Sequence, residues 1–189
     1  MAVDLPSVHE RALDHTGRYV AGVKAGQWHD PTPDDEWDVH ALVNHVVGGN
    51  FWVAPLVGGK SIDDVGDRYD GDLLGDDAVG AFQRSAKEAA AAFNAPGAMQ
   101  APCAVSYGPV PGEIYAGHRF IDVLIHGWDL ARATGQDTAL PAELVEACFE
   151  VVEPQRALLE ASGMFGGDVA APPGADRQTE LLAVLGRQA

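Results

Sequence analysis

Basic residues, cysteines and long apolar runs are all scarce in this chain of 189 residues. Its 12 basic residues stand against 28 acidic ones, so the formal net charge is −16. Such a charge repels phosphate backbones and anionic membrane surfaces, and we therefore expect neither nucleic acid nor a membrane as a partner. No stretch of the sequence approaches the roughly 18 consecutive apolar residues of a membrane-spanning helix.

The two cysteines, Cys103 and Cys148, are too few for a disulfide scaffold. No basic segment followed by an apolar run and a cleavage site opens the chain. We therefore expect a reduced, cytoplasmic protein in which neither thiol has a catalytic role.

Apolar residues recur at helical spacing along most of the chain, and an alternating strand pattern is almost absent. The expected helices run from about Pro6 to Val23, from Thr32 through His45, from about Asp76, through Asp122 to Gly135, from Pro141 to Pro154, and from Thr179 to Leu185. Between the third and fourth of them, residues 94–117 are expected to form a loop with a short extended piece at residues 104–107. We expect one domain over residues 1–189, with a tail from about residue 166 that is loosely attached.

A polar stripe on an otherwise apolar helix is the most informative feature of the sequence. Asp122 and His126 are four residues apart, so their side chains share one face of a helix and can converge on one point. A buried carboxylate without a partner is costly, and the stripe therefore indicates either a hydrogen-bond network or a bound cation. His118 lies one turn further back and is expected at the rim of the site rather than as a ligand. Trp128 and Asp129 are expected to pack against the helix and to cap its end.

A second histidine-bearing helix is predicted upstream. Thr32 offers an N-cap hydroxyl, followed by proline and two acidic residues, which together are typical of a helix N-terminus. His45 then falls on the apolar stripe of this helix and is expected to face inward. His40 lies about 140° away around the helix, and we interpret it as a surface or capping residue.

Three segments carry a resemblance to a known family. They are Trp37-x7-His45-Val-Val-Gly-Gly-Asn, Asp122-x3-His126-Gly-Trp-Asp-Leu-Ala-Arg-Ala-Thr-Gly-Gln136 and Glu180-Leu-Leu-Ala-Val-Leu-Gly-Arg187. They resemble the DinB-like superfamily and, more closely, the metal-binding domain of mycothiol-dependent maleylpyruvate isomerases and their actinobacterial relatives. The resemblance implies an all-α, up-down-down-up four-helix bundle with additional short helices, and a divalent metal held by His45, Asp122 and His126.

Two departures from the family pattern bear on the substrate. This chain has Asp122 where the isomerase has glutamate and most members of the superfamily have histidine. It also has no room for the separate C-terminal domain that contributes to the site of the isomerase. We therefore expect a small-molecule substrate other than maleylpyruvate.

Two imidazoles and one carboxylate leave at least one coordination position open, which is typical of catalytic rather than structural zinc. We expect zinc, with nickel and manganese as alternatives. A thiol such as mycothiol in the open position would give a thiol transferase or isomerase, whereas water there would give a metal-dependent hydrolase. A non-enzymatic metal-binding module that forms a homodimer is the third interpretation.

Overall fold

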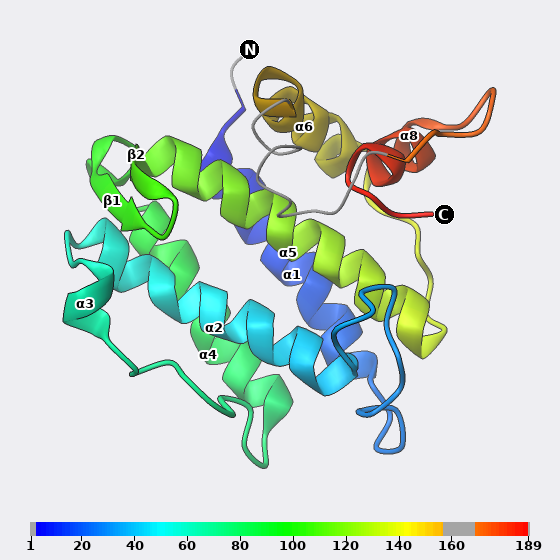
Figure 1. The fold of residues 1–189 in the computed structure, drawn as a ribbon, viewed down its shortest axis with the longest axis horizontal. Coiled ribbons are helices and arrows are strands. Elements are labelled where there is room, and N and C mark those ends of the chain that lie inside the picture. Colours follow the sequence, from blue (N-terminus) through cyan, green and yellow to red (C-terminus); the bar gives the residue numbers. More distant parts are fainter. Residues whose placement is uncertain (1–2, 157–168, 189) are drawn as a thin grey trace. The chain divides into compact units, whose positions relative to one another are not determined.

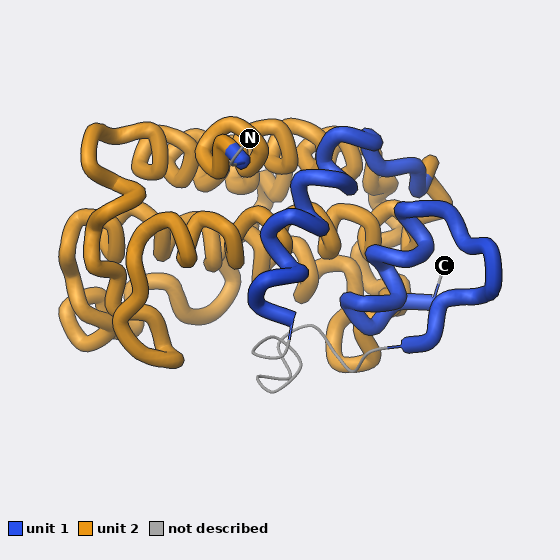
Figure 2. Tube along the Cα trace, turned by 90° about the horizontal axis from the view of Figure 1, so that it is seen from above, with its two compact units in different colours: residues 1–3, 138–189 blue, residues 4–137 orange. Residues whose placement is uncertain are grey.

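The computed structural model describes residues 3–156 and 169–188 (Figure 1). The chain divides into two units, residues 4–137 and residues 1–3 together with 138–189 (Figure 2). The single domain over residues 1–189 stays a prediction, and residues 166–168 and 189 of its expected tail lie outside the described residues.

Four long helices dominate the larger unit. They are α1 (Leu5–Gly22), α2 (Val39–Val57), α4 (Ala78–Phe93) and α5 (Gly112–Thr134). In Figure 1, α1 packs against α4 and α5, and α2 packs against the same two helices, so the four close into a bundle. This arrangement confirms the prediction of an all-α fold. In the described residues, no helix combines the length and the apolarity needed to cross a bilayer.

Side chains and one glycine fix the ends of these helices where the sequence indicated. The carboxylate of Asp77 accepts the backbone N–H of Gly80 at 2.9 Å and so caps the N-terminus of α4. Helix α5 ends at Gly135, whose φ of 68° is the left-handed conformation that glycine adopts without a steric cost.

The start of α2 differs from the prediction. The helix begins at Val39, with Asp38 as its N-cap, and not at Thr32. The hydroxyl of Thr32 instead donates a hydrogen bond to the carbonyl oxygen of Trp37 at 2.9 Å. Residues 32–37 therefore form a turn, because their polar groups bond within the loop rather than to a first helical turn. This turn holds Trp37 beside α2.

The shorter elements of the larger unit are α3 (Ile62–Val65), η1 (Ala98–Gln100), β1 (Pro102–Val105) and β2 (Gly108–Pro111). The two strands pair antiparallel, so the expected extended piece at residues 104–107 is half strand and half turn, with Tyr107 in the turn. Helix α5 begins at Gly112, five residues before the end of the expected loop. Glycine is needed there because a Cβ would clash with the carbonyl oxygen of Ala98.

The smaller unit contains α6 (Ala142–Val152), η2 (Glu153–Gln155) and α8 (Arg177–Val184). Helix α6 ends just before Pro154, as predicted. Arg177 of α8 links that helix to α6. Its guanidinium pairs with Glu146 at 3.1 Å and lies 3.7 Å above the centroid of the Phe149 ring.

His9 of α1 is a fully buried imidazole in the larger unit. Its ring meets that of Phe93 edge to face, with the centroids 5.0 Å apart. Burial, assisted by the positive charge of Arg119, lowers the pKa of His9 to about 3. The ring is therefore neutral in the folded protein at physiological pH.

This buried ring predicts a loss of stability in acid. His9 has its ordinary pKa of 6.5 in the unfolded chain and about 3 in the folded one, so the folded state loses stability as the pH falls below 6.5. Between pH 7 and pH 5, we expect the unfolding free energy of the metal-free protein to fall by about 2 kcal/mol more than that of a His9→Phe variant. Urea denaturation at the two pH values measures the difference, and equal losses in both proteins would contradict the prediction.

Candidate metal centre

Helices α2 and α5 bring three candidate ligands together at one point of the bundle. The Nε2 atom of His45 lies 3.1 Å from Oδ1 of Asp122, and Nε2 of His126 lies 3.6 Å from the same oxygen. One donor atom from each of the three residues lies within 4.8 Å of the other two. In the described residues, the group that meets this criterion includes neither His118 nor His40.

The separations suit a small divalent cation. In a tetrahedral site with bonds of about 2.0–2.1 Å, neighbouring donor atoms lie about 3.3 Å apart. The two observed separations, 3.1 and 3.6 Å, bracket that value. Two neutral nitrogens and one carboxylate oxygen also match the donor preference of zinc. The side chain of His45 is 36% exposed, so the cluster is accessible from solvent on the α2 side.

The carboxylate of Asp122 is held by a buried arginine. Nη1 of Arg119 lies 2.8 Å from Oδ2 of Asp122, while its Nη2 donates to Oδ1 of Asn50 at 3.0 Å. Burial alone would raise the pKa of Asp122, but the Arg119 guanidinium and the two imidazoles outweigh it and hold that pKa well below its usual range. The carboxylate is therefore charged at any physiological pH, with Oδ1 facing the two imidazoles.

A glycine makes room for this arginine. The guanidinium of Arg119 crosses α2 at Gly49, where a Cβ would clash with it. Gly49 follows His45 by four residues on α2, so the two lie on the same side of that helix. The function of Gly49 in the structure is to let a charged side chain of α5 reach across α2.

The imidazole of His126 is oriented by a second carboxylate. Its Nδ1 lies 3.1 Å from Oδ2 of Asp129, which is fully buried. With the Nδ1 proton donated to Asp129, Nε2 of His126 carries the lone pair toward Asp122, as in many metal-binding histidines. Asp129 was predicted to cap the helix end, and the structure instead pairs it with His126. Its spacing of three residues from His126 was the available signal.

An indole covers the two imidazoles. The ring of Trp37 stacks on that of His45, with the centroids 4.4 Å apart, and it meets the ring of His126 at 5.4 Å. The sequence marked Trp37 only as the start of a motif. Its position depends on the turn that precedes α2, which the sequence predicted as helix.

The other histidines of the prediction lie outside the donor cluster. Nδ1 of His118 lies 2.6 Å from the hydroxyl of Tyr107, and His118 is buried on α5 one turn before Asp122. Nε2 of His40 lies 3.5 Å from a carboxylate oxygen of Asp72, and the side chain is 35% exposed. The interpretation of His40 as a surface residue agrees with this position.

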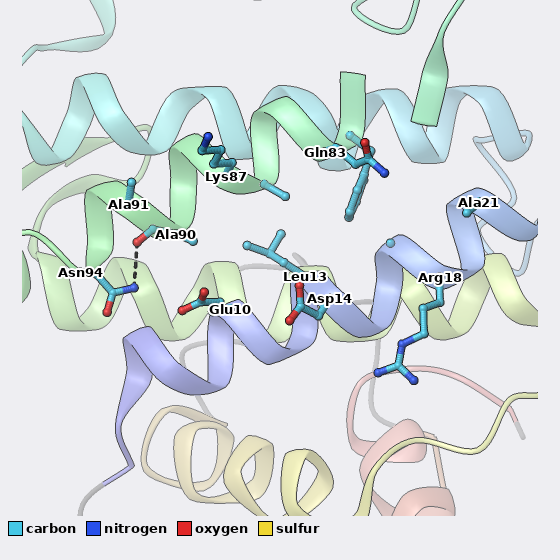
Figure 3. A pocket seen from close by; sticks show the side chains of 13 residues that line it. Glu10, Leu13, Asp14, Arg18, Ala21, Gln83, Lys87, Ala90, Ala91 and Asn94 are labelled. Carbon is cyan, nitrogen blue, oxygen red and sulfur yellow. Dashed lines mark hydrogen bonds between the residues drawn. The ribbon is translucent and has the colours of Figure 1, made fainter. Parts of the chain in front are cut away.

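A groove of about 680 Å³ runs between α1 and α4 (Figure 3). Leu13 and Phe82 contribute to its apolar part, and charged side chains such as Asp14 and Lys87 line it as well. None of the three candidate ligands lines this groove. We therefore assign it no part in the chemistry of the metal centre.

Comparisons with known proteins identify the family of the chain. Residues 9–131, which contain all three candidate ligands, match the family described as the mycothiol maleylpyruvate isomerase N-terminal domain. Two proteins of Mycobacterium tuberculosis, named uncharacterized protein Rv0738 and uncharacterized protein MT0763, are each 38% identical to the chain in an alignment of 188 positions that covers 95% of this chain and 95% of the relative.

Solved structures share the fold. A mycothiol-dependent maleylpyruvate isomerase matches with a TM-score of 0.66 at 14% identity, over 92% of this chain and 77% of the isomerase. A variant of such an isomerase matches with a TM-score of 0.63 at 13% identity. At these identities the likeness shows the fold alone, which is the DinB-like bundle that the sequence predicted. By the match over residues 9–131, the chain belongs to the mycothiol maleylpyruvate isomerase N-terminal domain family.

Proposed function

We propose that His45, Asp122 and His126 bind one divalent cation, with zinc as the first candidate and nickel and manganese as alternatives. The convergence of three donor atoms supports this proposal most directly. The second polar atom of two of these ligands is already engaged, because Arg119 holds Oδ2 of Asp122 and Asp129 holds Nδ1 of His126. The remaining polar atoms of these two ligands, Oδ1 of Asp122 and Nε2 of His126, face each other.

The metal centre is proposed to serve an enzyme that uses a low-molecular-weight thiol, such as mycothiol, in transferase or isomerase chemistry. Family membership supports the thiol, and the set of three protein ligands leaves a position for its sulfur. When bound, the cation would lower the pKa of that thiol and hold it as a thiolate.

The residues of the chain contribute position and charge. Asp129 fixes the ring of His126, and Arg119 keeps one oxygen of Asp122 away from the centre, so that the carboxylate offers a single donor atom. Trp37 stacks on the imidazole of His45 and restricts the orientation of that ring. Together they hold three ligands in place before a thiol arrives, which lowers the cost of ordering the site.

Cobalt substitution tests thiol binding. We expect the cobalt-loaded protein to develop a sulfur-to-metal charge-transfer band in the near ultraviolet when mycothiol is added. A His45→Ala variant should lose the band, whereas His40→Ala, on the same helix but outside the cluster, should keep it. If a fully metal-loaded wild-type protein gives no band and binds no mycothiol, the hydrolase or the binding module becomes the better interpretation.

A further inference from the structure

A buried hydrogen-bond relay leads from α4 through α2 to the candidate ligand Asp122. Nη1 of Arg119 lies 2.8 Å from Oδ2 of Asp122, and its Nη2 donates to Oδ1 of Asn50 at 3.0 Å. Nδ2 of Asn50 donates in turn to Oγ of Ser85 at 3.2 Å, and the Ser85 hydroxyl donates to the carbonyl oxygen of Phe82 at 2.9 Å. Asn50 and Ser85 are fully buried, so the relay joins three helices inside the core of the bundle.

The relay has a fixed direction. A serine hydroxyl has one proton to donate, and that of Ser85 goes to the carbonyl oxygen of Phe82 on its own helix. The oxygen of Ser85 is then left to accept a hydrogen bond, so it binds the NH₂ end of the Asn50 amide. The carbonyl end of that amide points to Arg119, which has only donors to offer. Ser85 therefore sets the orientation of the Asn50 amide.

Asn50 is the main restraint on the Arg119 guanidinium apart from Asp122 itself. Nη2 of Arg119 has a second contact, with the carbonyl oxygen of Val46, but at 3.4 Å it is longer than the bond to Asn50. Within the part of the chain that the structure describes, Nε of Arg119 has no hydrogen-bond partner. Without Asn50, the guanidinium would be free to turn together with the carboxylate that it binds.

The position of the guanidinium decides how many oxygens Asp122 offers to a cation. With Oδ2 bound to Arg119, only Oδ1 of Asp122 faces the two imidazoles. A carboxylate that offers one oxygen suits a four-coordinate cation such as zinc. A carboxylate that is free to offer both oxygens suits manganese, which prefers six ligands and oxygen donors.

We propose that Asn50, oriented by Ser85, is a positioning residue of the metal centre, which acts through Arg119 to keep Asp122 to one oxygen and so sets the discrimination between zinc and manganese. This inference rests on the proposed function, since a cation must be bound at the cluster. It assigns a role to two polar side chains that lie in the core, on α2 and α4, and that are not themselves ligands.

The ratio of the affinities for zinc and manganese tests the role of Asn50. Asn50→Leu keeps the branched shape of the side chain and removes both of its hydrogen bonds, while Ser85 keeps its bond to Phe82. We expect the affinity for zinc relative to manganese to fall about 10-fold or more, as is typical when the partner behind a metal ligand is lost. Cobalt bound to this variant should show weaker visible absorption bands than in the wild type, because those bands weaken when cobalt gains ligands beyond four.

Ser85→Ala is a milder variant of the same relay. It leaves the acceptor of the guanidinium in place but removes the group that orients the Asn50 amide, so the ratio should shift in the same direction by a smaller factor. In an Asn50→Leu background, Ser85→Ala should cause no further shift, because the two residues act through one network. Additive shifts would show that Ser85 does not act through Asn50.

Asn44→Leu is the matched control, because Asn44 is on the same helix and also makes two hydrogen bonds, to Gly71 and Leu73. It should keep the wild-type ratio. If Asn50→Leu weakens both metals equally and leaves the cobalt spectrum unchanged, the positioning role of Asn50 is refuted while the metal site stands. If Asn50→Leu does not fold, a wild-type ratio in Ser85→Ala refutes that role. If the wild-type protein binds neither metal, the proposed function fails as well.

Discussion

Replacing His126 with alanine is expected to lower the affinity for a divalent metal by more than the 10- to 100-fold that loss of a ligand's hydrogen-bond partner typically costs. His126 supplies one of the three donor atoms, and it is the most buried of the three ligands, so no solvent-exposed group replaces it easily. Competition with a chromophoric chelator measures the affinity, and far-ultraviolet circular dichroism checks that most of the helicity remains.

Two matched variants separate ligation from support. Asp129→Asn keeps all three donors and changes the hydrogen-bond partner of His126, so a loss of about 10- to 100-fold is expected. His40→Ala removes a histidine outside the cluster and should leave the affinity unchanged. Full metal occupancy in His126→Ala would show that the ligand assignment is wrong.

Replacing Arg119 with methionine is expected to cost about 3–5 kcal/mol of unfolding free energy in the metal-free protein. Methionine fills much of the same space but leaves the buried carboxylate of Asp122 without its cation, and it also removes the donor to Asn50. Urea denaturation in the presence of a chelator measures the loss. Arg84→Met is the control, because Arg84 pairs with Asp77 at 3.9 Å with both side chains more than 60% exposed, and such pairs contribute little.

Zinc should reverse part of this loss. A cation at the cluster compensates the charge of Asp122, so added zinc should stabilise Arg119→Met more than it stabilises the wild type. If zinc stabilises the two proteins equally, Arg119 contributes packing and not charge compensation, and the account of the Asp122 environment is wrong.

The ligands themselves were within reach of sequence reasoning. The four-residue spacing of Asp122 and His126, and the place of His45 on an apolar stripe, are local patterns with a fixed meaning on a helix. The structure places their donor atoms within 4.8 Å of one another. That they bind a metal stays a prediction, which the experiments above address.

The groups that support the ligands were harder to predict. Arg119 and Asp129 each lie three residues from a ligand on α5, yet neither spacing says that Arg119 also crosses α2 to reach Asn50. That contact depends on Gly49 and on the packing of two helices distant in sequence. The capping prediction for Asp129 was wrong because the free backbone groups near the C-terminus of α5 are carbonyl oxygens, to which a carboxylate cannot donate a hydrogen bond.

The predicted starts of α2 and α5 were wrong for a similar reason. Thr32 carries the signals of a helix N-terminus, but its hydroxyl bonds to the carbonyl of Trp37 within a turn. Gly112 starts α5 early because it packs against Ala98, a contact that no local pattern announces. A competing hydrogen bond decides the structure at Thr32, and a nonlocal contact decides it at Gly112. The first of them affects the candidate site, because it positions Trp37 beside His45.

The metal content of the wild-type protein tests the central claim most directly. Protein purified without an affinity tag and without added metal, then dialysed against a zinc buffer, is analysed for all divalent metals by mass spectrometry. We predict about one divalent ion per chain, as expected for a single site with three protein ligands. A protein that stays free of metal after this treatment, while retaining its helicity, would contradict the account.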